Sequence, residues 1–199
     1  IPVVVINDAC KAVPAAKALL AGGIKVIEIT FRTAAARRAI AEVCMHVPGM
    51  LVGAGTIINT DQLDQALEAG AKFIVSPGLN VDLIKAAHAK SVMILPGAVT
   101  PTEIMQGLEL GIQTFKFFPS ENYGGLNTIN ALAAPFAEID FIPTGGISAK
   151  NLAGYMQNKR VAAIGGSWMA TSEMIDSARY DDITSLTLEA MSIVNSIRS

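Results

Sequence analysis

The chain has 199 residues, 51% of them hydrophobic, and a formal net charge of −2. Its acidic and basic residues are scattered, which argues against a partner such as nucleic acid or an anionic membrane surface and favours a small molecule. This length and apolar content suit one hydrophobic core, so we expect a single domain over residues 1–199.

Apolar, β-rich runs alternate along the chain with segments of helical spacing. The expected strands are residues 3–6, 26–31, 51–56, 73–76, 93–96, 114–118, 139–144 and 161–165. The helical segments between them include residues 14–21, 34–47, 60–69, 80–91 and 100–110, and several end at a glycine that suits a helix C-terminus. Eight units of roughly 20 to 26 residues predict an α/β fold, a single closed (β/α)8 or TIM barrel.

The alternative architecture is an open, doubly wound sheet. Such a sheet usually carries a Gly-x-Gly-x-x-Gly turn after its first strand. Here that turn reads Asn7-Asp8-Ala9-Cys10, without a glycine. The strand count and the missing glycines favour the barrel.

Lys116 is the most informative candidate residue. It lies in the run Thr114-Phe115-Lys116-Phe117-Phe118, and side chains alternate along a strand, so Lys116 and Phe118 share one face. Inside a barrel the lysine would lose hydration, which favours the neutral amine that attacks a carbonyl. The alternative is a surface lysine whose stem packs on apolar neighbours while its ammonium reaches water.

A second polar set alternates with apolar residues in the expected strand 26–31. Glu28, Thr30 and Arg32 share one face, and burying the glutamate or arginine alone would cost several kcal/mol. Arg32 follows the end of the strand and suits a substrate carboxylate. The alternative is an ion pair between Glu28 and Arg32 that only satisfies the barrel core.

Two glycine pairs follow the last two expected strands, at Gly145-Gly146 and at Gly165-Gly166, the second followed by Ser167. Backbone N–H groups of such loops can approach an anion closely, and barrels commonly bind phosphate after strands seven and eight. We therefore expect a phosphorylated substrate, with the Ser167 hydroxyl as a further donor. Each glycine pair by itself would also be an ordinary tight turn.

Histidine and cysteine usage bears on metals and on cellular location. His46 and His88 lie in separate helical segments, so the usual three-ligand catalytic zinc site is not expected, and we expect neither metal nor cofactor. Two cysteines in a chain rich in apolar residues indicate a reduced, intracellular protein. Lys, Pro or Gly interrupts every long apolar stretch, so we expect a cytoplasmic protein without a membrane span.

Together these segments resemble the 2-keto-3-deoxy-6-phosphogluconate (KDPG) aldolase family. The resemblance rests on residues 22–33, 52–56, 76–78, 115–119, 143–148 and 164–168. It implies that Lys116 forms a Schiff base and that Glu28 moves protons. It implies further roles for the other candidates: substrate binding by Arg32, Thr56, Pro77, Phe118 and Thr144, and phosphate binding by Gly145, Gly146, Gly166 and Ser167.

The resemblance also implies a class I aldolase and a homotrimer. Such an enzyme cleaves KDPG to pyruvate and glyceraldehyde 3-phosphate, and members of the family often also cleave 4-hydroxy-2-oxoglutarate. They usually have a helix before the first strand, whereas this chain begins almost at the strand, and whether such a helix belongs to the protein is left open. The preferred aldehyde, the C4 stereochemistry and the direction of flux are open as well.

Two other functions use parts of the same pattern. A sugar-phosphate isomerase or epimerase would use the glycine loops but would need two acid/base groups rather than an amine. A non-catalytic barrel that binds a phosphorylated ligand would not need an inward lysine, glutamate and arginine together. Lys116 among phenylalanines favours the aldolase over both.

Overall fold

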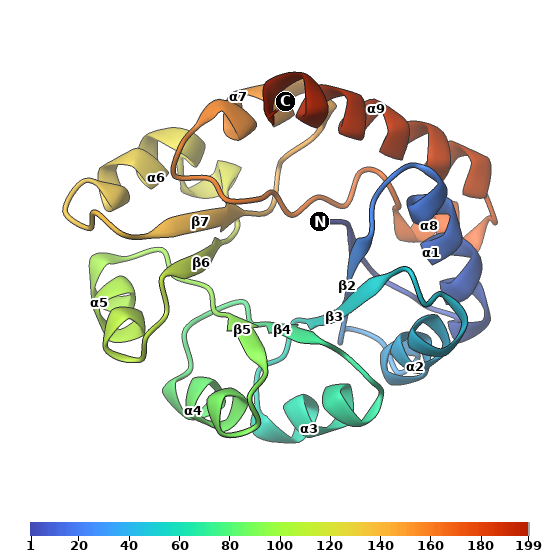
Figure 1. The fold of residues 1–199 in the computed structure, drawn as a ribbon, viewed down its shortest axis with the longest axis horizontal. Coiled ribbons are helices and arrows are strands. Elements are labelled where there is room, and N and C mark those ends of the chain that lie inside the picture. The colour runs from blue at the N-terminus through green and yellow to red at the C-terminus, as the bar shows by residue number, and fades with distance from the viewer. Residues whose placement is uncertain (199) are drawn as a thin grey trace.

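The computed structural model describes residues 1–198, which form a ring of parallel strands surrounded by helices (Figure 1). The strands are β1 (Val3–Val4), β2 (Val26–Thr30), β3 (Leu51–Gly55), β4 (Phe73–Val75), β5 (Met93–Leu95), β6 (Thr114–Phe117) and β7 (Asp140–Pro143). All seven end one or two residues earlier than the sequence predicts. Thr56, Phe118 and Thr144 therefore lie immediately after strands, at the rim of the ring.

A helix follows each strand, and two short 3₁₀ helices, η1 (Ala9–Lys11) and η2 (Glu121–Tyr123), lie in the connections. The α-helices are α1 (Ala12–Ala21), α2 (Ala36–His46), α3 (Thr60–Glu68), α4 (Val81–Ala89), α5 (Pro101–Glu109), α6 (Gly125–Ala133), α7 (Ala149–Gln157), α8 (Ser172–Asp176) and α9 (Tyr180–Arg198). The starts of α3, α4 and α5 follow from capping: the side chains of Asn59, Asn80 and Thr100 each accept a hydrogen bond from a backbone N–H of the first turn.

Two sheets join to close the ring. Strands β1 to β5 pair in sequence order, and β6 pairs with β7, all in parallel. The bridge between Gly97 and Lys116 joins the two sheets, and the bridge between Pro2 and Gly166 returns the chain to β1. The sequence-based prediction of a closed barrel rather than an open sheet is confirmed by this topology.

The eighth expected strand is present only as an eighth segment with isolated bridges. Val161 pairs with Phe141 and Gly165 pairs with Thr144, but the residues between them form no continuous ladder. The prediction of a regular strand over residues 161–165 is therefore wrong in detail. Alanine and glycine, which make up three of these five residues, have low strand propensity, so the segment keeps its place in the ring without a full ladder.

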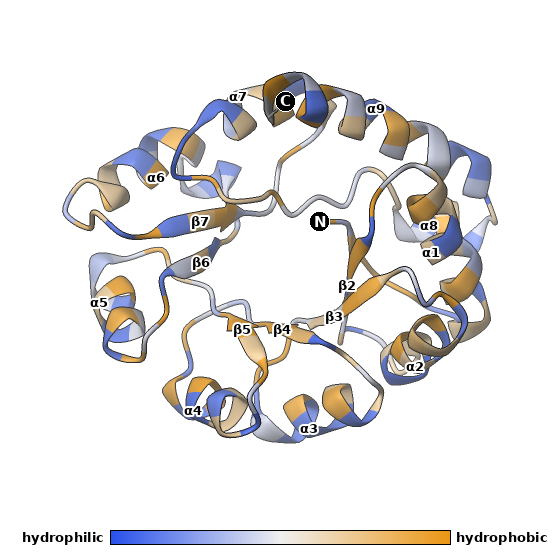
Figure 2. Ribbon diagram, in the orientation of Figure 1, coloured by the Kyte–Doolittle hydropathy of each residue, from blue (hydrophilic) through white to orange (hydrophobic). Residues whose placement is uncertain are grey.

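Alternation along the strands separates two environments. Ile27 and Ile29 of β2 are fully buried under the helices, whereas Glu28 and Thr30 lie on the opposite, inner face. Strands β2 to β5 are mainly hydrophobic and the outer helices carry both hydrophobic and hydrophilic residues (Figure 2). The main core therefore lies between strands and helices, while the inside of the ring is free to hold polar groups.

None of the helices in the described part of the chain is both long and apolar enough to cross a membrane. Cys10 and Cys44 are both free thiols. His46 ends α2 and His88 lies in α4, in the outer layer of helices. Both histidines therefore lie in helices, as the sequence predicts, and not at the ends of the strands.

Candidate active site

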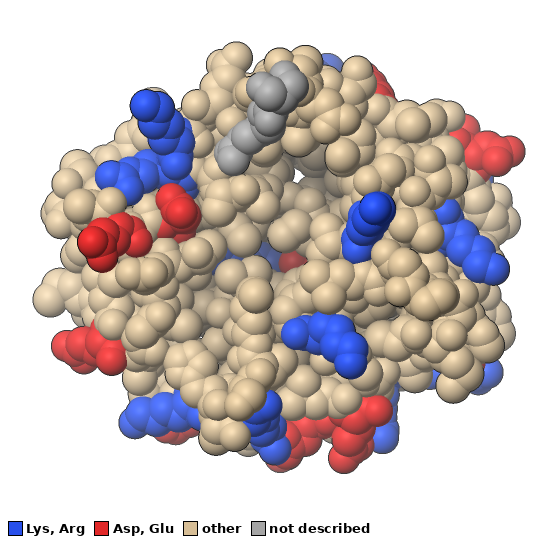
Figure 3. Space-filling view, in the orientation of Figure 1, with Lys and Arg blue, Asp and Glu red and all other residues tan. Residues whose placement is uncertain are grey.

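Lys116 and Glu28 meet inside the ring. The Nζ of Lys116 lies 3.2 Å from Oε1 of Glu28, and the two residues are only 6% and 3% exposed. A hollow near the centre of the molecule has a basic and an acidic side chain on its floor (Figure 3). The alternative of a surface lysine is therefore wrong, because Lys116 projects into the barrel and its polar partner is a carboxylate rather than bulk water.

Neighbouring aromatic residues fix the orientation of Lys116. Phe115 and Phe117, on the opposite face of β6, are fully buried and pack against Phe141 with ring centroids 6.4 and 5.9 Å apart. On the inner side, Nζ of Lys116 lies 5.5 Å from the centre of the Phe118 ring. The face assignment made from the sequence is confirmed, and the packed outer face holds the lysine inward.

The small residues of β3 make room for the inward side chains. A Cβ on Gly53 would lie 2.2 Å from the ring of Phe73, and a Cβ on Gly55 would lie 2.0 Å from Oε1 of Glu28. Both glycines are on the inner face of the same strand, because alternate residues share a face. From the sequence these small residues would leave room for a ligand or form an ordinary turn, whereas in the structure they leave room for the side chains of Phe73 and Glu28.

Arg32 lies at the rim of the ring and does not pair with Glu28. Its Nε donates a hydrogen bond to Oγ1 of Thr56 over 3.2 Å, and its side chain is exposed. Thr56 has a positive φ of 59°, which few residues other than glycine adopt. Thr30, between Glu28 and Arg32, donates to the carbonyl of Val4 instead. The alternative of a structural ion pair between Glu28 and Arg32 is thus not found.

A polar cavity of about 280 Å³ opens at the carboxyl ends of the strands. The candidate residues that line it are Arg32, Phe118, Thr144, Gly145, Gly146, Gly166 and Ser167. The barrel thus brings together residues from the ends of β2, β6 and β7 and from the eighth segment. Lys116, Glu28 and Thr56 are not among the lining residues, but Phe118 and Arg32, which are, contact Lys116 and Thr56 respectively. Pro77 is exposed in the loop after β4 and is not among the lining residues, so its expected role in substrate binding stays a prediction.

Sequence reasoning missed two hydroxyl residues at this cavity. Thr171 and Ser172, at the start of α8, also line it, and Oγ1 of Thr171 accepts a hydrogen bond from the N–H of Met174. A threonine that precedes Ser-Glu is a common helix start, and this pattern could have located them. They follow the second glycine pair by only a few residues, so this short spacing was a second signal that could have found them.

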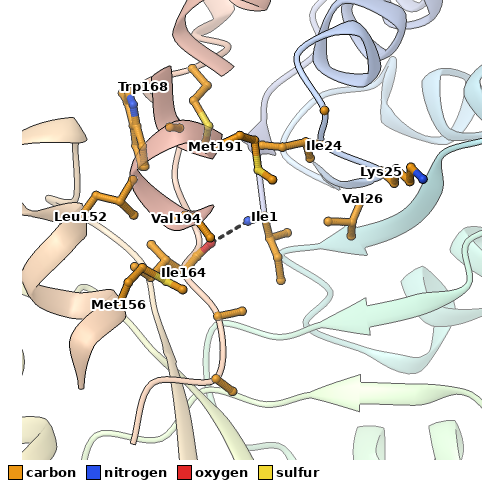
Figure 4. A pocket seen from close by; sticks show the side chains of 15 residues that line it. Ile1, Ile24, Lys25, Val26, Leu152, Met156, Ile164, Trp168, Met191 and Val194 are labelled. Atoms are coloured by element: carbon orange, nitrogen blue, oxygen red, sulfur yellow. Dashed lines mark hydrogen bonds between the residues drawn. The ribbon is translucent and has the colours of Figure 1, made fainter. Parts of the chain in front are cut away.

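A second cavity, of about 330 Å³, lies near the starts of β2 and of the eighth segment (Figure 4). Its walls are apolar and include Ile24, Val26, Met156, Ile164, Met191 and Val194. The Ile1 nitrogen donates to the carbonyl of Ile164 over 2.7 Å beside it. Although Lys25 also lines this cavity, no aspartate or glutamate does, so it has no amine–carboxylate pair like that of Lys116 and Glu28.

Comparisons with known proteins agree with this geometry. The model of the KDPG and KHG aldolase family matches residues 1–186, where KHG denotes 4-hydroxy-2-oxoglutarate. The chain is 47% identical over 191 residues to the 2-dehydro-3-deoxy-phosphogluconate aldolase of Dickeya dadantii strain 3937, which covers 96% of this chain and 90% of the relative.

Two solved structures are also similar. The KDPG aldolase of Legionella pneumophila, with pyruvate captured as a covalent carbinolamine, superposes with a TM-score of 0.91 at 38% identity, over 95% of this chain and 93% of that one. The KDPG aldolase of Zymomonas mobilis ZM4, with 3-phosphoglycerate, superposes with a TM-score of 0.90 at 45% identity, over 96% of this chain and 90% of that one. These likenesses extend over the whole barrel, and the chain belongs to the KDPG and KHG aldolase family.

Proposed function

We propose that this protein is a class I aldolase that cleaves KDPG to pyruvate and glyceraldehyde 3-phosphate through a Schiff base on Lys116. The observation that carries the proposal is the buried contact between Lys116 and Glu28, an amine and a proton acceptor held 3.2 Å apart inside the barrel. Family membership supports it, as does the relative whose structure captures pyruvate in a covalent carbinolamine.

The reaction begins when the neutral amine of Lys116 adds to the C2 ketone of the substrate. The resulting carbinolamine loses water to give a protonated imine, which serves as an electron sink. Glu28, directly or through water, takes the proton of the C4 hydroxyl as the C3–C4 bond breaks. The bonding electrons pass to the imine nitrogen, which leaves the enamine of pyruvate and releases the aldehyde.

The second half of the reaction returns the enzyme to its starting state. Glu28 supplies a proton, directly or through water, to C3 of the enamine, and water then hydrolyses the imine to free pyruvate and Lys116. One carboxylate can serve both transfers because it gains a proton in the first and loses it in the second. The contact with Lys116 keeps the Glu28 carboxylate close to the substrate that is bound to this lysine.

The remaining candidates bind the two ends of the substrate. Arg32 and Thr56 hold the carboxylate of the keto acid, with Pro77, Phe118 and Thr144 along the substrate. Gly145, Gly146, Gly166 and Ser167 hold the phosphate. Because the phosphate lies away from the breaking bond, its binding energy acts through positioning and contributes mainly to kcat/KM.

Cleavage of 4-hydroxy-2-oxoglutarate to pyruvate and glyoxylate is a second proposed activity, favoured by the family to which the chain belongs. The same amine and carboxylate would act on it, because the bond that breaks lies in the same position relative to the ketone. We further propose a single catalytic domain, a homotrimer and a cytoplasmic location. Light scattering of the purified protein tests the trimer, and a monomeric or dimeric mass would contradict it.

The test of the proposed function measures release of pyruvate from KDPG and from 2-keto-3-deoxygluconate, which lacks only the phosphate. We expect cleavage of both, with a much higher kcat/KM for KDPG. A sugar-phosphate isomerase or epimerase would release no pyruvate, and neither would a binding protein. Equal kcat/KM values for the two substrates would contradict the phosphate site while leaving the aldolase chemistry intact.

A further inference from the structure

Three side chains beside the Gly145-Gly146 turn have no part in the mechanism above. Tyr155 of α7 is only 2% exposed, and its hydroxyl donates a hydrogen bond to the carboxylate of Glu121. The hydroxyl of Ser120, which is fully buried, lies 2.9 Å from the same phenol oxygen. A phenol has one proton to donate, and Glu121 receives it, so Ser120 is the donor to Tyr155.

The peptide that carries Glu121 is bonded directly to the turn. The N–H of Ser120 donates to the carbonyl of Thr144 over 2.8 Å, and the N–H of Glu121 donates to the carbonyl of Gly145 over 3.2 Å. A Cβ on Gly146 would lie 2.5 Å from both Cβ and Cγ of Glu121. The stem of the Glu121 side chain therefore packs against the back of the turn that we propose binds phosphate.

A carboxylate in this place poses an electrostatic problem. Rotation about the outer bonds of the Glu121 side chain would bring its negative charge toward the phosphate of a bound substrate. No basic side chain that the structure describes lies within ion-pair distance of this carboxylate, although Lys150 lines the same surface cavity. Glu121 lines that surface cavity and not the polar cavity, and its carboxylate accepts a hydrogen bond there from the hydroxyl of Tyr155.

The protonation state of Tyr155 suits this role. Burial, together with the hydrogen bond to Glu121, raises its pKa to about 12. The phenol therefore keeps the proton that it donates.

We propose that Tyr155 is a positioning residue that holds the Glu121 carboxylate away from the phosphate-binding turn and so sets the affinity for phosphorylated substrates. This inference rests on the proposed function, because it assumes that phosphate binds at Gly145-Gly146 and Gly166-Ser167. It predicts an effect on the phosphate end of the substrate alone.

The test begins with Tyr155→Phe, which removes the hydroxyl but keeps the packed ring. For a like charge that comes within several ångströms of a dianion in a partly wet site, KM for KDPG should rise by about 3- to 30-fold. The value of kcat should change less than about twofold, and so should KM for 2-keto-3-deoxygluconate. Tyr123→Phe is the matched control, because Tyr123 lies in the same 3₁₀ helix as Glu121 but is 52% exposed.

The double variant Tyr155→Phe with Glu121→Gln separates electrostatics from packing. Removing the charge should restore KM for KDPG to within about twofold of the parent, even though the hydrogen bond is still missing. A double variant as impaired as Tyr155→Phe would overturn the proposal, because the tyrosine would then only stabilise the loop. A Tyr155→Phe variant with normal KM, or with equal losses on both substrates, would overturn it too.

Ser167→Ala distinguishes failure of this inference from failure of the phosphate site. If Ser167→Ala selectively impairs KDPG while Tyr155→Phe does not, the phosphate binds as proposed and the role of Tyr155 is wrong. If neither variant changes the preference for KDPG, both the phosphate site and the role of Tyr155 are wrong. Trapping of pyruvate on Lys116 tests the aldolase chemistry independently of either outcome.

Discussion

Gly55 leaves open the space that the Glu28 carboxylate occupies. A methyl group at this position would lie 2.0 Å from Oε1 and 2.7 Å from both Cδ and Cγ of Glu28, far inside van der Waals contact. The position of the proposed proton acceptor therefore depends on a missing side chain on the neighbouring strand. The contact between Glu28 and Lys116 depends in turn on that glycine.

Gly55→Ala should therefore impair catalysis by displacing Glu28. A shift of about 1 Å in a catalytic group can cost on the order of 10²-fold in rate, so we expect kcat to fall by roughly that amount. Steady-state kinetics on KDPG will measure this, with Gly154→Ala as the control because a Cβ there meets no atom within 4 Å. Parental kcat in Gly55→Ala would show that the enzyme tolerates a displaced Glu28.

Glu28→Gln should lower kcat while leaving Schiff-base formation possible. The amide keeps the shape of the side chain but cannot accept the C4 hydroxyl proton, and general acid/base catalysis contributes about 10²- to 10⁴-fold. The loss should appear in single-turnover cleavage of KDPG. Glu68→Gln, on the surface, is the control. Turnover by Glu28→Gln within about threefold of the parent would rule out the role in proton transfer.

Ser167→Ala should weaken binding of the phosphate. A hydrogen bond to a charged group contributes about 1.5–3 kcal/mol, which corresponds to a loss of roughly 10- to 150-fold in kcat/KM for KDPG. The value of kcat/KM for 2-keto-3-deoxygluconate should change little, because that substrate has no phosphate. Ser192→Ala, exposed on α9, controls for the loss of a surface hydroxyl. Equal losses on both substrates would mean that Ser167 supports the loop rather than the phosphate.

Alanine substitutions at Gly154 and at Gly22 should change the stability of the protein in opposite directions. Gly154 is exposed within α7 with open space around it, so Gly154→Ala should stabilise the protein by about 0.5–1 kcal/mol. Gly22 ends α1 against α9, where a Cβ would lie 2.4 Å from Cβ of Thr187, so Gly22→Ala should destabilise it by about 1–3 kcal/mol. Thermal unfolding measures both. A rise in Tm for Gly22→Ala would contradict the packing of α1 on α9.

The sequence predicts much of this fold because alternation in strands is a local property. The shared face of Lys116 in β6 and Phe118 just after it, and that of Glu28 and Thr30 in β2, follow from spacing alone. The regular spacing of βα units then places the ends of all strands at one rim. Arg32, Thr144 and the two glycine pairs therefore converge as expected.

The rest depends on contacts between distant residues, which spacing cannot supply. The pairing of Glu28 with Lys116 rather than Arg32 depends on how the strands are staggered around the ring. Likewise, the contact of Tyr155 with Glu121 joins a helix to a loop 34 residues earlier. In the eighth segment, contacts with neighbouring strands keep the chain in the ring although its residues have low strand propensity.

The central claim is that Lys116 is the nucleophile, and covalent capture tests it most directly. The protein is incubated with pyruvate and sodium borohydride, digested, and analysed by mass spectrometry, with Lys116→Met treated in parallel. We expect one reduced pyruvate adduct, on the peptide that contains Lys116, and none in the variant. An active preparation in which Lys116 is unmodified, or in which another lysine alone carries the adduct, would contradict the account.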